Sequence, residues 1–171
     1  MNFELKNLVN SHQNFPKEGI IFRDILPLLQ NPMGFDQVIE SMSKSSIFKN
    51  ADAIIAIDAR GFIFGTAISI KLSKPMIVAR KPGKLPGLLI SKSYDLEYGE
   101  SSLSVQKEAL ENFESYAIVD DLLATGGTVK CVYDLAMEAN KKITGLSVVI
   151  ELKDLKAKEN LPFKIDSHIT F

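Results

Sequence analysis

Four short runs of apolar residues stand out along the chain, at 51–57, 75–79, 116–119 and 143–150. They are continuous rather than alternating in polarity, which is typical of parallel strands buried on both faces. Helical patterns, with apolar residues three and four positions apart, lie at about 35–48, 62–73 and 128–140. Strands that alternate with helices predict an α/β fold with an open, mainly parallel, doubly wound sheet.

Two segments do not follow this alternation. Residues 15–30 precede the first predicted sheet strand and could form a small cap. Residues 82–105 form a long connection that contains Gly83, Gly87 and Gly99. In a compact domain, a connection of this length is more often functional, for example as a flexible lid, than idle. The length of 171 residues otherwise predicts one domain with a substantial core.

The composition excludes several classes of protein. Twenty basic and 21 acidic residues give a net charge of -1, so no basic surface for nucleic acid is expected. Cys131 is the only cysteine, which excludes an internal disulfide and fits a reducing compartment. Its place in a helical apolar pattern predicts a core residue. The first 15 residues do not resemble a signal peptide, and no apolar run could span a membrane, so we expect a cytoplasmic protein.

Candidate chemistry is concentrated in residues 119–128, VDDLLATGGT. Asp120 and Asp121 follow a predicted buried strand, and ligands of open α/β sheets bind beyond the carboxyl ends of the strands. The turn from Thr125 to Thr128 precedes a predicted helix, whose first N–H groups and dipole favour an anion. Because this turn lacks the lysine of a nucleoside-triphosphate P-loop, a single terminal phosphate is the better candidate.

The two aspartates must serve a different part of the same ligand, since a carboxylate repels a phosphate. Carboxylate oxygens only accept hydrogen bonds, so vicinal sugar hydroxyls or a hydrated magnesium ion would suit them. The residues therefore favour a sugar phosphate as the ligand. An acidic pair without a ligand, followed by an ordinary Gly-Gly turn, is the alternative.

The segment IVDDLLATGGT resembles the signature with which type I phosphoribosyltransferases bind 5-phosphoribosyl pyrophosphate (PRPP). FPKEGIIFRDILPLL, DARGFIFG, ARKPGKLPG and SYDLEYG match the members that act on adenine, in the same order, and the matches cover most of residues 15–152. The resemblance implies that PRPP and adenine react to AMP and pyrophosphate in purine salvage, with Mg²⁺ held mainly by PRPP and water. A 6-oxopurine as the base, or a non-catalytic PRPP-sensing regulator, are the alternatives. Such a regulator would usually carry an additional DNA-binding module.

The resemblance assigns the PRPP-binding residues. Asp120 and Asp121 would hold the ribose hydroxyls. The residues that would wrap the 5-phosphate are Ala124, Thr125, Gly126, Gly127 and Thr128. Arg60, in DARG at a predicted strand-to-helix turn, would be a catalytic residue close to the pyrophosphate. An ordinary turn with an exposed arginine is the structural alternative there.

The resemblance also implies a homodimer and a catalytic loop. Arg80 and Lys81 would bind pyrophosphate, with Arg80 acting across the subunit interface. By itself, a segment such as ARKPGK is more often a solvated basic loop. Glu97, on the long connection, would be catalytic and lie near the imidazole side of the base.

Adenine would be bound by Ile21, Phe22 and Arg23, in a hood within about residues 1–34. A backbone edge could match the N6 donor and N1 acceptor of adenine, while Phe22 stacks on the ring. These side chains could equally form the core of the cap. Residues 155–161 depart from the family, which tends to show LKGREKL where this chain has LKAKENL, so no role is transferred to this segment.

Overall fold

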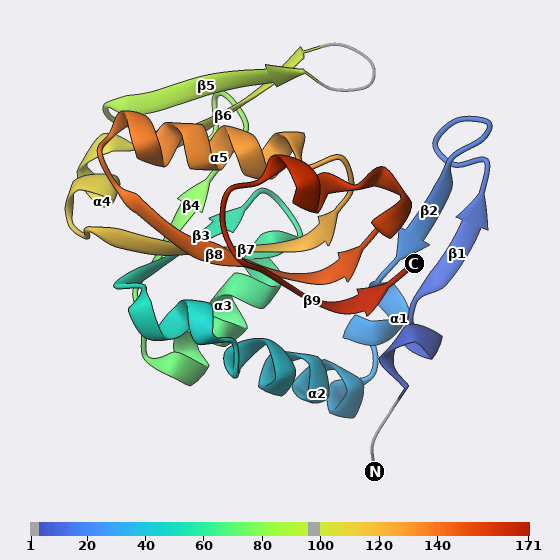
Figure 1. The fold of residues 1–171 in the computed structure, drawn as a ribbon. Coiled ribbons are helices and arrows are strands. Elements are labelled where there is room, and N and C mark those ends of the chain that lie inside the picture. Colours follow the sequence, from blue (N-terminus) through green and yellow to red (C-terminus); the bar gives the residue numbers. More distant parts are fainter. Residues whose placement is uncertain (1–3, 96–99) are drawn as a thin grey trace. The chain divides into compact units, whose positions relative to one another are not determined.

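A parallel sheet of five strands lies at the centre of residues 42–171, in the order β4-β3-β7-β8-β9 (Figure 1). Its strands are β3 (Ala53–Ile57), β4 (Met76–Ala79), β7 (Ser115–Leu123), β8 (Lys142–Glu151) and β9 (Ile165–Thr170). The chain is described by a computed structural model at residues 4–95 and 100–171. The predicted α/β class and the four predicted strands are confirmed, whereas β9 was not predicted. Polar residues in its sequence, IDSHIT, interrupt the apolar run, because β9 is an edge strand and is only partly buried.

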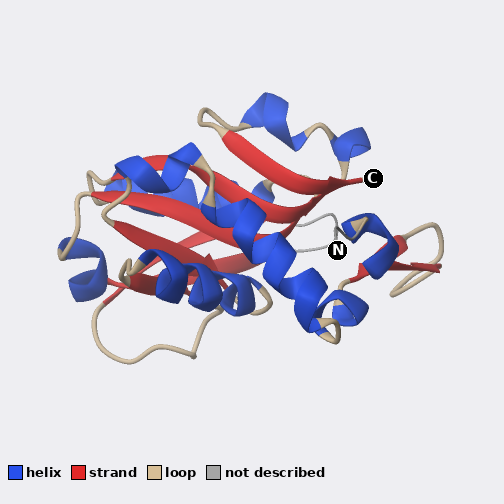
Figure 2. Cartoon of the chain, turned by 90° about the horizontal axis from the view of Figure 1, so that it is seen from below, coloured by secondary structure: helices blue, strands red, loops and turns tan. Residues whose placement is uncertain are grey.

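Helices cover both faces of this sheet (Figures 1 and 2). α3 (Gly61–Leu72) packs on β3 and β7, and α5 (Gly127–Glu138) packs on β8. Both agree closely with the predicted ranges. Cys131 of α5 is buried, as its place in the apolar pattern predicts. Shorter elements of the same unit are the helix α4 (Lys107–Glu111) and the 3-10 turns η2 (Ser46–Asn50), η3 (Lys153–Leu155) and η4 (Ala157–Asn160).

Most of the long connection 82–105 is a β-hairpin. Its strands are β5 (Leu89–Asp95) and β6 (Glu100–Gln106), which pair in antiparallel register. The hairpin lies against α5, on the side of this helix that faces away from the sheet (Figure 1). A bridge between Arg80 and Ser104 joins its second strand to the end of β4. Residues 96–99 lie outside the described residues, and the predicted flexibility of the connection stays a prediction.

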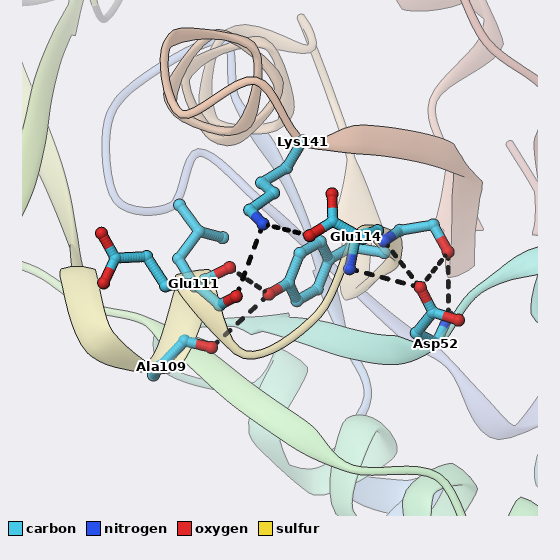
Figure 3. A network of polar contacts seen from close by, with 8 residues as sticks. Asp52, Ala109, Glu111, Glu114 and Lys141 are labelled. Carbon is cyan, nitrogen blue, oxygen red and sulfur yellow. Dashed lines mark hydrogen bonds and ion pairs between the residues drawn. The ribbon is translucent and has the colours of Figure 1, made fainter.

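The amino ends of β3 and β7 are joined by a polar network (Figure 3). The Asp52 carboxylate accepts hydrogen bonds from the Ser115 backbone N–H at 3.0 Å and from the Ser115 hydroxyl at 2.8 Å. Lys141 donates to the Glu114 carboxylate at 2.9 Å. The Tyr116 hydroxyl donates to a backbone carbonyl of α4 at 2.7 Å, and burial raises the pKa of this phenol to about 12. These contacts lie at the opposite end of the strands from the candidate chemistry.

The chain divides into two compact units, Met1–Ser41 and Met42–Phe171. The elements of the first unit are η1 (Leu5–Leu8), β1 (Asn10–Gln13), β2 (Ile21–Asp24), α1 (Leu26–Leu29) and most of α2 (Pro32–Ser43). β1 and β2 pair as an antiparallel ribbon, in which His12 lies opposite Phe22. In the part of the chain that the structure describes, no helix has the length and apolar character to cross a membrane.

Candidate functional site

A cavity of about 420 Å³ opens where β3, β4 and β7 end. Its lining comprises Asp58, Ala59, Arg60, Lys81, Tyr94, Asp120, Asp121, Leu122, Leu123, Ala124, Thr125, Gly126, Gly127, Thr128 and Val129. Residues predicted from three separate sequence segments therefore meet around one space. All of the predicted ribose and phosphate residues line this cavity, and so do Arg60 and Lys81.

The acidic pair lies inside a strand and not beyond its end, so the predicted strand boundary was wrong. β7 continues to Leu123 because β8 is long enough to pair with it up to Glu151. Asp120 and Asp121 are therefore held in the sheet, and both are buried, with only 7% and 6% of their surface exposed. A rigid strand fixes these carboxylates more firmly than a loop would.

The Asp120 carboxyl occupies a tightly limited space beside α3. Burial, and next the charge of Asp121, raise its pKa well above the ordinary carboxyl range. The N–H of Asp121 donates to Asp120 Oδ1 at 2.9 Å. A Cβ at Gly61 would lie 2.8 Å from the same oxygen and 3.0 Å from the Val119 carbonyl, so only glycine fits there. Gly61 was not predicted, although it directly follows Arg60 in the sequence.

Arg60 links the predicted pyrophosphate site to the predicted ribose site. Its Nε lies 2.6 Å from Asp121 Oδ2, while 41% of the arginine side chain remains exposed. The guanidinium therefore borders the cavity and neutralises part of the acidic pair. A charge-assisted hydrogen bond of this length orients both groups. Arg60 can thus act on an anionic group in the cavity from a defined position.

The phosphate turn, residues 124–128, leads into α5 as predicted. Gly126 has φ +88°, a left-handed conformation that favours glycine, and it precedes the first helical residue, Gly127. The first N–H groups of a helix have no acceptor within it. At this end of α5 they and the helix dipole are suited to a phosphate.

Asp58 organises the basic end of β4. Its Oδ2 lies 3.3 Å from Arg80 Nε and accepts a hydrogen bond from the Lys81 N–H, also at 3.3 Å. The Arg80 guanidinium lies over the Phe62 ring, 5.5 Å from its centroid. Lys81 lines the cavity of its own chain, whereas Arg80 contacts Asp58. Asp58 was not predicted, and its position at the end of a buried strand is the signal that could have found it.

Two further groups of predicted residues stay untested. Ile21, Phe22 and Arg23 form part of β2 in the first unit. There Ile21 is exposed, the Phe15 and Phe22 rings make a T-shaped contact with their centroids 5.2 Å apart, and Arg23 donates to the Ser11 hydroxyl. Glu97 lies outside the described residues. Their roles stay predictions.

Tyr94 also lines the cavity, although it was not predicted as a site residue. It lies on β5 and shares this lining with the phosphate turn. Among the residues that the structure describes, no group of three or more His, Cys, Asp and Glu side chains is arranged to hold a metal ion.

The geometry has counterparts in known proteins. A family model described as phosphoribosyl transferase domain matches residues 27–170. An adenine phosphoribosyltransferase of Prochlorococcus marinus strain MIT 9211 is 62% identical over 98% of this chain and 97% of the relative. A crystal structure of the enzyme of that name from Thermoanaerobacter pseudethanolicus has a TM-score of 0.92 and 38% identity, and covers 98% of each chain. The Saccharomyces cerevisiae enzyme, complexed with an imino-altritol bisphosphate and adenine, has a TM-score of 0.88 at 32% identity over 96% of each chain.

Proposed function

The chain belongs to the phosphoribosyltransferase family, and we propose that it transfers the 5-phosphoribosyl group from PRPP to adenine in purine salvage. The observation that carries this proposal is the meeting of the phosphate turn, the buried acidic pair, Arg60 and Lys81 around one cavity. Each of these groups suits a different part of PRPP. The names of the similar proteins support adenine as the base.

The reaction is a displacement at the anomeric carbon of ribose. A bond forms between this carbon and N9 of adenine, while its bond to the pyrophosphate oxygen breaks and the electron pair leaves with pyrophosphate. Residues 124–128 hold the 5-phosphate, and Asp120 and Asp121 accept hydrogen bonds from the ribose hydroxyls. Arg60 and Lys81 stabilise the charge that develops on the leaving group. Because both ends of PRPP are fixed in this way, the reacting atoms are held in position, which accelerates the displacement.

Mg²⁺ fits the acidic lining of the cavity. Asp120 and Asp121 offer buried oxygen atoms at its wall, and such oxygens suit the water shell of a magnesium ion that enters with PRPP. When bound, the ion neutralises pyrophosphate oxygens. Arg60 Nε, 2.6 Å from Asp121 Oδ2, orients the Asp121 carboxylate.

Further residues handle the base and its proton. Ile21, Phe22 and Arg23 bind adenine through the edge of β2 and by stacking, and the T-shaped contact between Phe22 and Phe15 supports this by orienting the ring. The Glu97 carboxylate accepts a hydrogen bond from the imidazole N–H of the base and takes up this proton as N9 bonds to the ribose carbon. The connection that carries Glu97 covers the site and excludes water, since hydrolysis of PRPP is the competing reaction.

The enzyme works as a cytoplasmic homodimer in which Arg80 acts on the pyrophosphate of the partner subunit. Ile63 and Ile70, seven positions apart on one face of α3, are 39% and 76% exposed, and such apolar side chains favour a protein partner for this helix. Arg80 lies beside α3, over the ring of Phe62. A dimer formed through this helix would bring Arg80 close to the second subunit.

An assay with four bases tests the proposal. The protein is incubated with PRPP and Mg²⁺, and adenine, hypoxanthine, guanine or orotate is added while pyrophosphate is followed. Release of pyrophosphate with adenine, together with formation of AMP, is expected. Turnover of hypoxanthine or guanine in place of adenine would support a 6-oxopurine enzyme. PRPP binding without turnover of any base would support a regulator.

A further inference from the structure

The phosphate turn has a second layer behind it, formed by residues 157–161. A Cβ at Gly126 would lie 3.3 Å from the Ala157 Cβ and 3.6 Å from Leu161 Cδ1, so these two side chains stand close behind the turn. Ala157 and Leu161 are 3% and 8% exposed. They belong to the same buried cluster as Val129, which follows the turn in α5. The turn is therefore backed by apolar side chains that are remote in sequence.

An ion pair anchors this segment to the sheet. Lys158 Nζ lies 2.7 Å from Oε2 of Glu151, the last residue of β8, which is only 5% exposed. The Ser167 hydroxyl donates to the same carboxylate. Burial alone would raise the pKa of Glu151, yet the hydrogen bonds from Lys158 and Ser167 bring it below its ordinary value. Glu151 lies opposite Leu123 in the sheet, and Leu123 is the residue directly before the phosphate turn.

We propose that residues 157–161 are a brace that holds the phosphate turn in its binding conformation, with Lys158 as a positioning residue that acts through Glu151. The inference rests on the proposed function, because it takes a phosphate of PRPP as the ligand of the turn. A turn that contains adjacent glycines has many accessible conformations. Holding it in one of them before the ligand arrives lowers the entropic cost of binding.

Lys158 does not act by touching the ligand. Its ammonium group is bonded to Glu151, and the cavity is lined by residues up to Val129 and not by residues of the brace. The Ala157 methyl group lies 3.3 Å from the place of a Cβ at Gly126, so it stands directly behind the turn. Lys158 supplies the positive charge that the buried Glu151 carboxylate requires.

The test is Lys158→Met, which keeps the apolar stem of the side chain and removes its charge. We expect the Kd of PRPP, measured by calorimetry in the presence of Mg²⁺, to rise about tenfold or more, since a displacement of ~1 Å in a positioned group can cost ~10²-fold. The KM of adenine at saturating PRPP should not change. Lys158→Arg should restore the wild-type Kd.

Lys156→Met is the matched control. It makes the same substitution directly before the brace, at a pair with Glu159 that is 3.9 Å long and whose side chains are 70% and 68% exposed. Exposed pairs contribute little, so this variant should bind PRPP like the wild type. Leu161→Ala is a second variant, which removes apolar volume behind Gly126 and leaves the anchor intact. It should also weaken PRPP binding.

A folded Lys158→Met protein with wild-type affinity for PRPP would overturn the brace, even if its Tm were lower. Unchanged PRPP affinity in folded Leu161→Ala protein would overturn it as well, and decides the question if Lys158→Met does not fold. These results leave the proposed function standing, provided that the wild type forms AMP from adenine and PRPP. A wild type that does not bind PRPP would refute the proposed function itself.

Discussion

Gly61→Ala gives the sharpest test of the site, because it places one methyl group against one carboxyl. The new Cβ would lie 2.8 Å from Asp120 Oδ1 and 3.0 Å from the Val119 carbonyl oxygen, where ordinary contacts begin at 3.4 Å. The carboxyl must therefore move by about 0.6 Å, the difference between 3.4 and 2.8 Å. The strand carbonyl can yield less easily, since β7 is buried between two neighbouring strands.

Two free energies follow from this displacement. Overpacking of a well-packed site costs ~1–3 kcal/mol of folding stability, of which alanine returns up to ~1 kcal/mol through its higher helix propensity. Hydrogen bonds to charged groups contribute ~1.5–3 kcal/mol. Loss of the bond between Asp120 and a ribose hydroxyl should therefore raise the KM of PRPP about ten- to hundredfold.

Gly65→Ala is the control for destabilisation alone. It makes the same substitution one turn later in α3, where the new Cβ would lie 2.6 Å from the Ala56 Cβ and 3.1 Å from Met76 Sδ, in the core and not at the cavity. Steady-state kinetics at varied PRPP and thermal unfolding are measured for both variants. A KM of PRPP in Gly61→Ala that equals the value in Gly65→Ala would refute the reasoning.

Three further predictions concern the other site residues. Asp120→Asn should weaken PRPP binding and yet raise the Tm at pH 7. Because the pKa of Asp120 is raised in the folded protein, the folding stability of the wild type falls as the pH rises above ~4. The gain in Tm of the variant should therefore shrink toward pH 4 in thermal scans. A lower Tm at pH 7 would contradict the buried charge. Mixing inactive Arg80→Ala with inactive Asp121→Ala should restore some activity, since a hybrid dimer holds one site with neither defect; no recovery after confirmed subunit exchange would exclude action across the interface. Glu97→Gln should lower kcat by ~10²–10⁴-fold, as typical for general acid–base groups, with little change in the Kd of PRPP; near-normal turnover would leave this glutamate without a catalytic role.

The elements that could be predicted are those whose signal is local. Strands that are buried on both faces have continuous apolar runs in their sequence, so β3, β4, β7 and β8 could be predicted without knowledge of their neighbours. The phosphate turn was readable for the same reason, since two glycines and the helix that follows lie within a few residues. The edge strand β9 left no such signal, because a partly buried strand tolerates polar residues.

What only the tertiary structure decided are the contacts between segments that are remote in sequence. Asp58 holds Arg80 and Lys81 because β3 and β4 are neighbours in the sheet. Gly61 meets Asp120 because β7 lies on the other side of β3. Strand order and register decide these pairs, and the spacing of apolar residues along one strand contains neither. The sequence by itself therefore predicted the ribose and phosphate residues that line the cavity, while the fold decided which residues hold them in place.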